Sequence, residues 1–336
     1  MSFPLSESWR IQLPTWVSLP LVQHGDHLVV RVGSELRAIA AATGQQIWQA
    51  VVDDAGGAGS FVHGYNDLFL TDRRPEPDRL TELVAVQTGK LSFTVGLGCI
   101  VDRGASLIAA GIFYAIGNAP DVGPVLRAVN LSTGKQVLDV PLRAGADMLE
   151  RDGDRLLVGN RLASPGLYWL TPDGSRLSVL EQAPAQEMRV SRGRVLAALR
   201  EHDTDAPGRT ARVRDLASGA VLWSAPAQGP VIGLDGDSAV QYESQGDEQR
   251  IPVLREAATG KLRWRGPAVE DPSRVSFAGA YVFLGHMTGS VVHRRDDGSL
   301  VGALPLSRTA LAVEGGGEGG GSIVVGGFKF LAAFEP

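Results

Sequence analysis

One phrase of eight residues occurs twice in this chain, and a shorter form of it returns at regular intervals. The sequence AATGQQIW spans Ala41–Trp48, and AATGKLRW spans Ala257–Trp264. A dipeptide that ends in glycine recurs seven times, at Gly44, Gly89, Gly134, Gly174, Gly219, Gly260 and Gly298. The spacings are 45, 45, 40, 45, 41 and 38 residues. Such a period indicates a chain built from repeated supersecondary units.

Each repeated glycine lies between two runs of alternating apolar and polar residues, such as 36–41 and 45–52. This pattern predicts two antiparallel strands joined by a tight turn, in which glycine takes a positive φ. An aromatic residue follows the glycine by four positions at Trp48, Phe93, Trp223 and Trp264, and Trp9 stands on a similar strand without a preceding turn. We expect these rings to pack between neighbouring sheets.

Four strands fit into each repeat of about 42 residues, and helical periodicity is almost absent. Units of this size, repeated radially, are typical of a β-propeller. Residues 309–336 supply three strands and residues 7–14 a fourth. We therefore predict an all-β fold, an eight-bladed β-propeller of four-stranded antiparallel blades, forming one domain over residues 1–336. The N-terminal strand would complete the C-terminal blade and close the ring. Seven blades remain the alternative if residues 148–180 do not form a blade.

The phrases AATGQQIW, NLSTGKQVL, DLASGAVLW and EAATGKLRW resemble the pyrroloquinoline-quinone-type repeat, A-x-D-x-x-T-G-x-x-x-W. The resemblance covers essentially the whole chain and implies an eight-bladed propeller. Members of this superfamily include quinoprotein alcohol dehydrogenases, the lipoprotein of the Bam complex, and scaffolds or sensors that bind no quinone. The dehydrogenases use a pair of adjacent cysteines, whereas Cys99 is the only cysteine of this chain.

Composition limits the function. Lys and Arg total 32, Asp and Glu total 37, and the net charge of −5 with no basic run argues against nucleic-acid binding. No apolar stretch has the length of a membrane span. The N-terminal sequence lacks the pattern of a signal peptide, so we expect a cytoplasmic monomer, or a periplasmic or otherwise extracytoplasmic one if a leader has been removed.

The loops divide into two classes. Those joining the first strand to the second, and the third to the fourth, are short. Those joining the second strand to the third, and one blade to the next, are longer and more charged, as in 72–79 and 201–208. Binding usually resides in variable loops on a rigid scaffold. We therefore place a protein or small-ligand site on the long-loop face, with candidate residues Trp16, Asp53, Asp54, Arg73, Arg74, Arg143, His202, Asp203 and Asp271. The alternative interpretation is that these loops are merely solvated.

No catalytic residue or metal site is assigned. Arg73 and Arg74 could clamp an acidic partner through bidentate contacts. His202 and Asp203 resemble ligands of a hard metal, but the loop lacks a calcium-binding pattern. Two functions follow. The first is a binding scaffold without catalysis and without a cofactor. The second, implied by the resemblance alone, is an oxidoreductase or sensor that uses pyrroloquinoline quinone with calcium.

Overall fold

The glycine turns and alternating strands fold as the repeat predicts. The computed structural model describes residues 6–14, 17–52, 62–75, 80–200, 209–229, 231–245, 249–269, 271–286, 289–305, 307–313, 322–327 and 330–335. Within these ranges every helix or strand is a β-strand, and 32 strands form eight four-stranded antiparallel sheets. The chain divides into two compact units, Met1–Val140 with Leu306–Pro336, and Pro141–Pro305. Eight such sheets fit a β-propeller.

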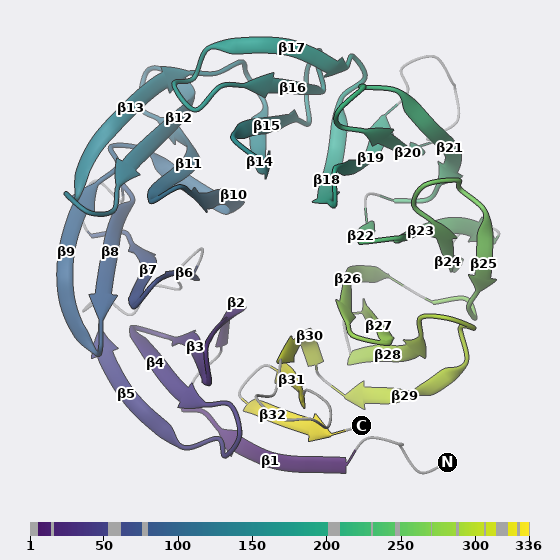
Figure 1. Ribbon diagram of the computed structural model, residues 1–336, viewed down its shortest axis with the longest axis horizontal. Helices are drawn as coiled ribbons and strands as arrows, with labels where there is room; N and C mark the ends of the chain where they lie inside the picture. The colour runs from purple at the N-terminus through teal and green to yellow at the C-terminus, as the bar shows by residue number, and fades with distance from the viewer. Residues whose placement is uncertain are drawn as a thin grey trace. The chain divides into compact units, whose positions relative to one another are not determined.

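Unit 1 holds four of these sheets (Figure 1). Three are formed by consecutive strands: β2 (Val17–His24), β3 (His27–Val32), β4 (Glu35–Ala40) and β5 (Gln46–Val51); β6 (Val62–Tyr65), β7 (Leu68–Arg73), β8 (Glu82–Gln87) and β9 (Lys90–Gly96); β10 (Ile100–Ala109), β11 (Ile112–Ala119), β12 (Gly123–Asn130) and β13 (Lys135–Pro141). The fourth joins the two ends of the chain, because β1 (Ser6–Gln12) pairs with β32 (Phe330–Glu335), beside β31 (Ser322–Gly327) and β30 (Ser307–Val313).

Unit 2 holds the other four sheets, each formed by consecutive strands. They are β14 (Ala146–Asp152), β15 (Arg155–Asn160), β16 (Leu167–Leu170) and β17 (Arg176–Glu181); β18 (Ala185–Ser191), β19 (Arg194–Arg200), β20 (Arg209–Asp215) and β21 (Val221–Ala227); β22 (Gly233–Asp235), β23 (Ser238–Gln245), β24 (Gln249–Glu256) and β25 (Leu262–Arg265); β26 (Pro272–Ala278), β27 (Tyr281–His286), β28 (Gly289–Arg294) and β29 (Leu300–Pro305). The predicted unit at 148–180 is therefore a four-stranded sheet.

First strands lie beside first strands within each unit. In unit 1, β2 contacts β30 and β6, and β6 contacts β10. In unit 2, β14, β18, β22 and β26 contact one another in that order (Figure 1). We call these eight the inner strands. Within each unit, residues at the starts of neighbouring inner strands therefore lie close together although they are far apart in the sequence.

The seven repeated glycines make the turns between the third and fourth strands. Their φ angles lie between 65° and 83°, as the repeat predicts. The amide of Gly44 donates to the carbonyl of Ala40 at 2.9 Å, and that of Gly260 donates to Glu256 at 2.9 Å. Because L-residues with a Cβ atom rarely adopt this conformation, glycine is the residue that closes each turn.

The repeated aromatic residue packs on the turn glycine of the next sheet. A Cβ atom built on Gly44 would lie 2.8 Å from Cε3 of Trp9, and one built on Gly260 would lie 2.7 Å from Cγ of Trp223. Each indole also binds the neighbouring turn: Nε1 of Trp9, Trp223 and Trp264 donates to the carbonyl of Ala41, Ala257 and Arg295 at 2.8, 3.0 and 3.2 Å. The prediction of rings packed between sheets is confirmed for these residues.

One sheet keeps this pattern with a phenylalanine, and another departs from it. Phe93 fills the corresponding place at Gly134, where a Cβ atom would lie 3.4 Å from its ring. At Gly219 the neighbour is Leu180, at 3.7 Å, which follows Gly174 by six positions instead of four. Two register shifts in the pairing of β16 with β17 account for the change, because each bulge offsets the strand relative to its partner.

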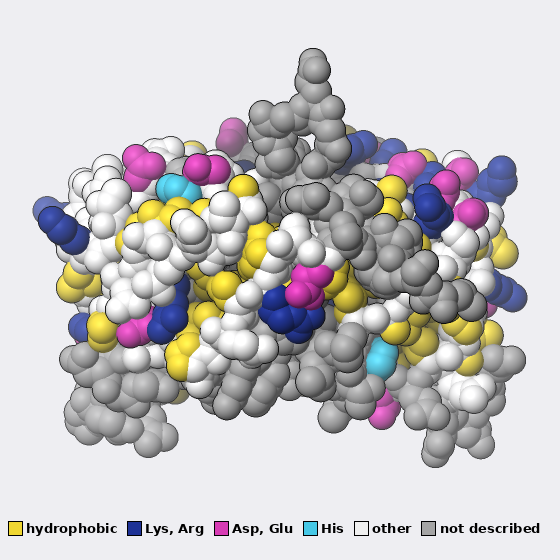
Figure 2. Space-filling view, turned by 90° about the horizontal axis from the view of Figure 1, so that it is seen from below, with side chains coloured by type: hydrophobic (Ala, Val, Ile, Leu, Met, Phe, Trp, Pro, Cys, Tyr) yellow, Lys and Arg dark blue, Asp and Glu magenta, His cyan; other side chains and the backbone are white. Residues whose placement is uncertain are grey.

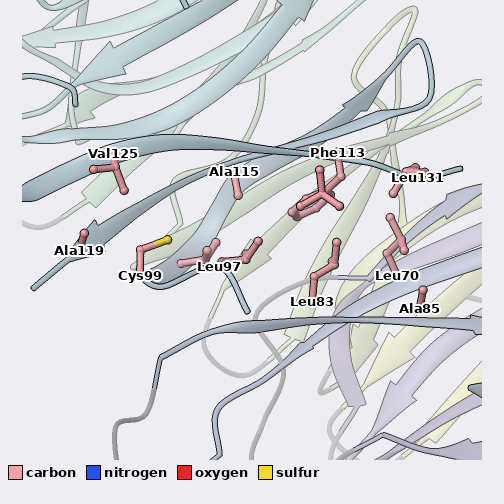
Figure 3. Close-up of a cluster of buried hydrophobic side chains, with 12 residues drawn as sticks. Leu70, Leu83, Ala85, Leu97, Cys99, Phe113, Ala115, Ala119, Val125 and Leu131 are labelled. Atoms are coloured by element: carbon pink, nitrogen blue, oxygen red, sulfur yellow. The ribbon is translucent and has the colours of Figure 1, made fainter. Parts of the chain in front are cut away.

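Apolar side chains fill the space between neighbouring sheets (Figure 3). Between β6–β9 and β10–β13, Leu70 and Leu83 face Phe113 and Cys99, and all four are fully buried. Burial raises the pKa of the Cys99 thiol to about 11, although the Arg127 charge acts in the opposite direction. Cys99 is therefore a buried thiol within an apolar cluster, as its neighbours in the sequence indicate.

Candidate functional site

The strand order places two kinds of connection at opposite ends of each sheet. The turns from first to second strand are tight in several sheets: His24 pairs with His27, Asp152 with Arg155, and Ser191 with Arg194. We call the other end, where second strands connect to third strands and each sheet connects to the next, the loop face. In the view of Figure 2, turned by 90° from that of Figure 1, the basic and acidic side chains that are coloured are interspersed.

Two of the predicted binding residues have partners within unit 1. Nε of Arg73 lies 2.7 Å from Oε2 of Glu82, its cross-strand neighbour. Nη2 of Arg74 donates to the carbonyl of Val101 at 2.5 Å. Both guanidinium groups therefore tie the end of β7 to neighbouring strands, and a role in recognition stays a prediction.

The other predicted residues are dispersed. Arg143 is exposed and donates through Nη1 to the carbonyl of Ser164 at 3.0 Å. Asp271 is exposed and has a φ of 44°, directly before β26. Trp16, Asp53, Asp54, His202 and Asp203 lie outside the described residues.

Charged side chains gather at the inner strands of unit 2, a group that the repeat pattern did not predict. We call this group the inner-strand cluster, and its members are Asp147, Glu150, Arg161, Glu187, Arg189 and Arg274. They come from β14, the residue after β15, β18 and β26. Nε of Arg161 lies 3.0 Å from Oδ2 of Asp147, and Arg189 forms an ion pair with Glu187.

Two members of the cluster occupy matching positions in the repeat. Glu187 pairs with Ala198 and Arg274 with Gly285, and each follows a register shift at the start of its inner strand. Met148, opposite Gly159, holds the same place in the neighbouring sheet and is buried. The repeat therefore presents an apolar side chain at this position in one sheet and opposite charges in two others. Glu187 and Arg274, charged residues that recur at one place in the repeat, are the sequence signal that could have identified the cluster.

The cluster lies in an environment that disfavours charge. Burial raises the pKa of Glu187, while the charges of Arg189, Arg161 and Arg274 lower it. Burial raises the pKa of Glu150 to about 7, against the opposing effect of Arg189. Burial also lowers the pKa of Arg274, and the neighbouring charge of Arg189 adds to that decrease. Glu150 thus changes its charge near neutral pH, next to fixed arginine charges.

This arrangement can bind a polar ligand. Arginines supply donors for carboxylate or phosphate oxygens, and Glu187 and Asp147 supply acceptors for a cation or an amide. Charged groups with shifted pKa values at one place are characteristic of functional sites, although structural ion-pair networks share this feature. Among the described residues, no group of three or more His, Cys, Asp or Glu side chains is placed to hold a metal ion.

No helix among the described residues is long and apolar enough to cross a membrane.

No protein-family model matches the sequence, and no curated protein matches it. Solved structures do match in fold. BamB from Moraxella catarrhalis is 14% identical with a TM-score of 0.71, covering 99% of this chain and 98% of its own.

Two further solved structures match this chain in fold. Sqt1 from Saccharomyces cerevisiae is 11% identical with a TM-score of 0.69, covering 98% of each chain. A europium-containing methanol dehydrogenase is 12% identical with a TM-score of 0.67, covering 97% of this chain and 86% of its own. At these identities the likeness concerns the fold alone.

Proposed function

We propose that this chain is a scaffold that binds a protein or a small ligand at the loop face of unit 2. The observation that supports this proposal is the position of Glu187, partly buried among Arg161, Arg189 and Arg274 at the start of an inner strand. Charges that only stabilise a fold are usually placed in solvent, where desolvation costs little. The fold alone does not choose a function, because BamB, Sqt1 and a methanol dehydrogenase all share it.

Co-purification from the source cells tests the proposal. A doubly substituted chain, Arg161→Gln with Arg274→Gln, removes two donors of the cluster without changing the size of either side chain greatly. We expect this variant to lose a bound protein or metabolite that the unmodified chain retains. Arg294→Gln is the matched control, since Arg294 is exposed at the opposite end of its sheet. Equal recovery of bound material from all three chains would place the binding site elsewhere.

The second candidate function is an oxidoreductase or sensor, favoured by the similarity to a methanol dehydrogenase. The residues that the structure describes fit a quinone with calcium poorly: they offer no cluster of carboxylates for the metal, and Cys99, the single cysteine, is buried between sheets. A ligand that binds the native state raises its melting temperature. An increase in the presence of pyrroloquinoline quinone and calcium would therefore support this function, and no shift at saturating quinone would exclude it.

Closure of all eight sheets into one ring, a single domain over residues 1–336, a monomeric state and a cytoplasmic location stay predictions. The pairing of β1 with β32 supports the first of these, because it joins the two ends of the chain in one sheet. Light scattering coupled to size-exclusion chromatography tests the monomer, and limited proteolysis tests the single domain. Release of Pro141–Pro305 as a stable fragment would contradict a single domain.

A further inference from the structure

Two arginine side chains meet at a glycine on the loop face of unit 2. Gly229 lies in the connection from β21 to β22 and has a φ of 85°. A Cβ atom built there would lie 3.8 Å from Nη1 of Arg209 and 3.7 Å from Nη1 of Arg250. Arg209 belongs to β20 and Arg250 to β24, so the two guanidinium groups come from different sheets and flank one point.

A third arginine adjoins this pair. Arg200, the last residue of β19, pairs directly with Arg209, the first residue of β20. Opposite partners of an antiparallel pair lie on the same side of the sheet, and like charges in this position are destabilising. Three positive charges therefore gather at the loop-face ends of two neighbouring sheets.

None of these three side chains forms a hydrogen bond or ion pair with the part of the chain that the structure describes. Neighbouring arginines do have acidic partners: Arg212 and Arg214 both bind Oε2 of Glu181, at 2.7 and 3.0 Å. The charges of Arg250 and Arg200, together with the larger effect of burial, lower the pKa of Arg209. The cluster at Gly229 thus differs from the balanced ion pairs around it.

Unit 1 contains a balanced counterpart. Gly98 lies in the connection from β9 to β10, has a positive φ of 60°, and is approached by the guanidinium of Arg127. There, Arg127 also donates to the carbonyl of Leu97, and its Nε lies 3.2 Å from Oδ1 of Asp139. One arginine at Gly98 is satisfied by its surroundings, whereas two arginines converge at Gly229 with no acidic partner among the described residues.

We propose that Arg209, Arg250 and Arg200 form a binding site for a single oxyanion, a carboxylate or phosphate group, beside Gly229. Guanidinium groups present paired donors that match both kinds of group, and two of them can hold one oxyanion between them. The net charge of −5 opposes the approach of a long polyanion, which favours one anionic group over a nucleic acid. The site does not depend on the proposed scaffold function, since it can bind a free anion even if no partner protein exists.

Calorimetry with two probes tests the proposal on the full chain. Inorganic phosphate represents a free anion, and a blocked hexaglutamate peptide represents an acidic segment of a partner. We expect at least one probe to bind, and Arg209→Gln and Arg250→Gln each to weaken it by roughly tenfold or more, since each removes a charge-assisted hydrogen bond. Arg294→Gln should bind as the unmodified chain does. Tighter binding of the peptide would assign the oxyanion to a protein, and binding of phosphate alone would assign it to a small ligand.

A stability measurement distinguishes an anion-binding site from a cluster of arginines whose charges are neutralised by acidic residues of the same chain. Arg200 is exposed, so Arg200→Gln removes a like charge with little loss of packing. At low ionic strength without anions, the melting temperature of this variant should rise above that of the unmodified chain, and added phosphate should reduce the difference. If Glu201, Asp203 and Asp205 of the adjoining loop neutralise the arginines, the melting temperature falls instead and neither probe binds. Either that result, or binding that survives both Arg209→Gln and Arg250→Gln, overturns the proposal; circular dichroism verifies that each variant is folded.

Discussion

Nε1 of Trp9 donates a hydrogen bond to the carbonyl of Ala41 at 2.8 Å, although the two residues belong to different sheets of unit 1. Trp9 lies on β1, which completes the sheet formed by the C-terminal strands, and Ala41 begins the turn after β4. The same contact joins Trp223 to Ala257 and Trp264 to Arg295. The repeated phrase therefore encodes both halves of a contact between sheets: the ring in one and the turn in the next.

Truncating the ring should destabilise the protein. Trp264 is buried, its indole stacks on His293 with centroids 5.6 Å apart, and its Nε1 binds the next turn. We expect Trp264→Ala to reduce the free energy of unfolding by about 3–5 kcal/mol, as for other large core truncations. Trp9→Phe keeps an aromatic ring but loses the hydrogen bond to Ala41, and should cost about 0.5–1.5 kcal/mol. Urea denaturation measures both, and equal stability of the two variants would contradict this ranking.

The turn glycine should be more sensitive to substitution than a glycine with a similar backbone and free surroundings. Gly260 has a φ of 71°, and a Cβ atom there would lie 2.7 Å from Trp223. Gly153 has a φ of 58°, with nothing within 4 Å of its Cβ position. Gly153→Ala should cost about 1–2 kcal/mol through backbone strain alone. Gly260→Ala should cost clearly more in the same denaturation experiment, because the methyl group also displaces the indole.

The sequence predicted the repeat contacts because they are local and recur. A glycine with positive φ and an aromatic residue at fixed spacing leave the same mark in each unit, so Gly44 and Trp48 could be interpreted without a structure. The contact of Leu180 with Gly219 was not predicted, because bulges in the pairing of β16 with β17 shift the position that faces this glycine. Spacing along one strand does not reveal a change of register with its partner.

The candidate sites were predicted less well. The long-loop face was chosen from loop length, which indicates where variation is tolerated but not which side chains meet. Arg209 and Arg250 are separated by 41 positions and come together only because β20 and β24 lie on adjacent sheets. Glu187 and Arg274 likewise share a cluster through the order of the inner strands. Such juxtapositions depend on how sheets pack, which a single sequence without recurring spacing does not specify.

Ionisation of Glu150 should lower stability above neutral pH. Its pKa is raised to about 7 in the folded chain by burial, from an ordinary value near 4.5. The folded state therefore binds the proton more tightly, and stability from this group is lost as pH rises through 7. Glu150→Gln should be more stable than the unmodified chain at pH 8, by on the order of 1–2 kcal/mol because Glu150 keeps some solvent contact. The difference should vanish near pH 4 in parallel urea titrations; a difference independent of pH would contradict the assignment.

His63 should show the opposite pH dependence. Burial lowers its pKa to about 4, and the ring contacts Ser106 Oγ through Nε2 at 2.9 Å and the edge of Phe113 at 5.9 Å between centroids. The folded state favours the neutral imidazole, so its contribution to stability is present above pH 6.5 and is lost as pH falls towards 4. A titration of the His63 ring resonances by NMR should give a midpoint below 5. A midpoint for His63 at or above 6 would mean that its ring is solvated and that its packing between β6 and β10 does not persist in solution.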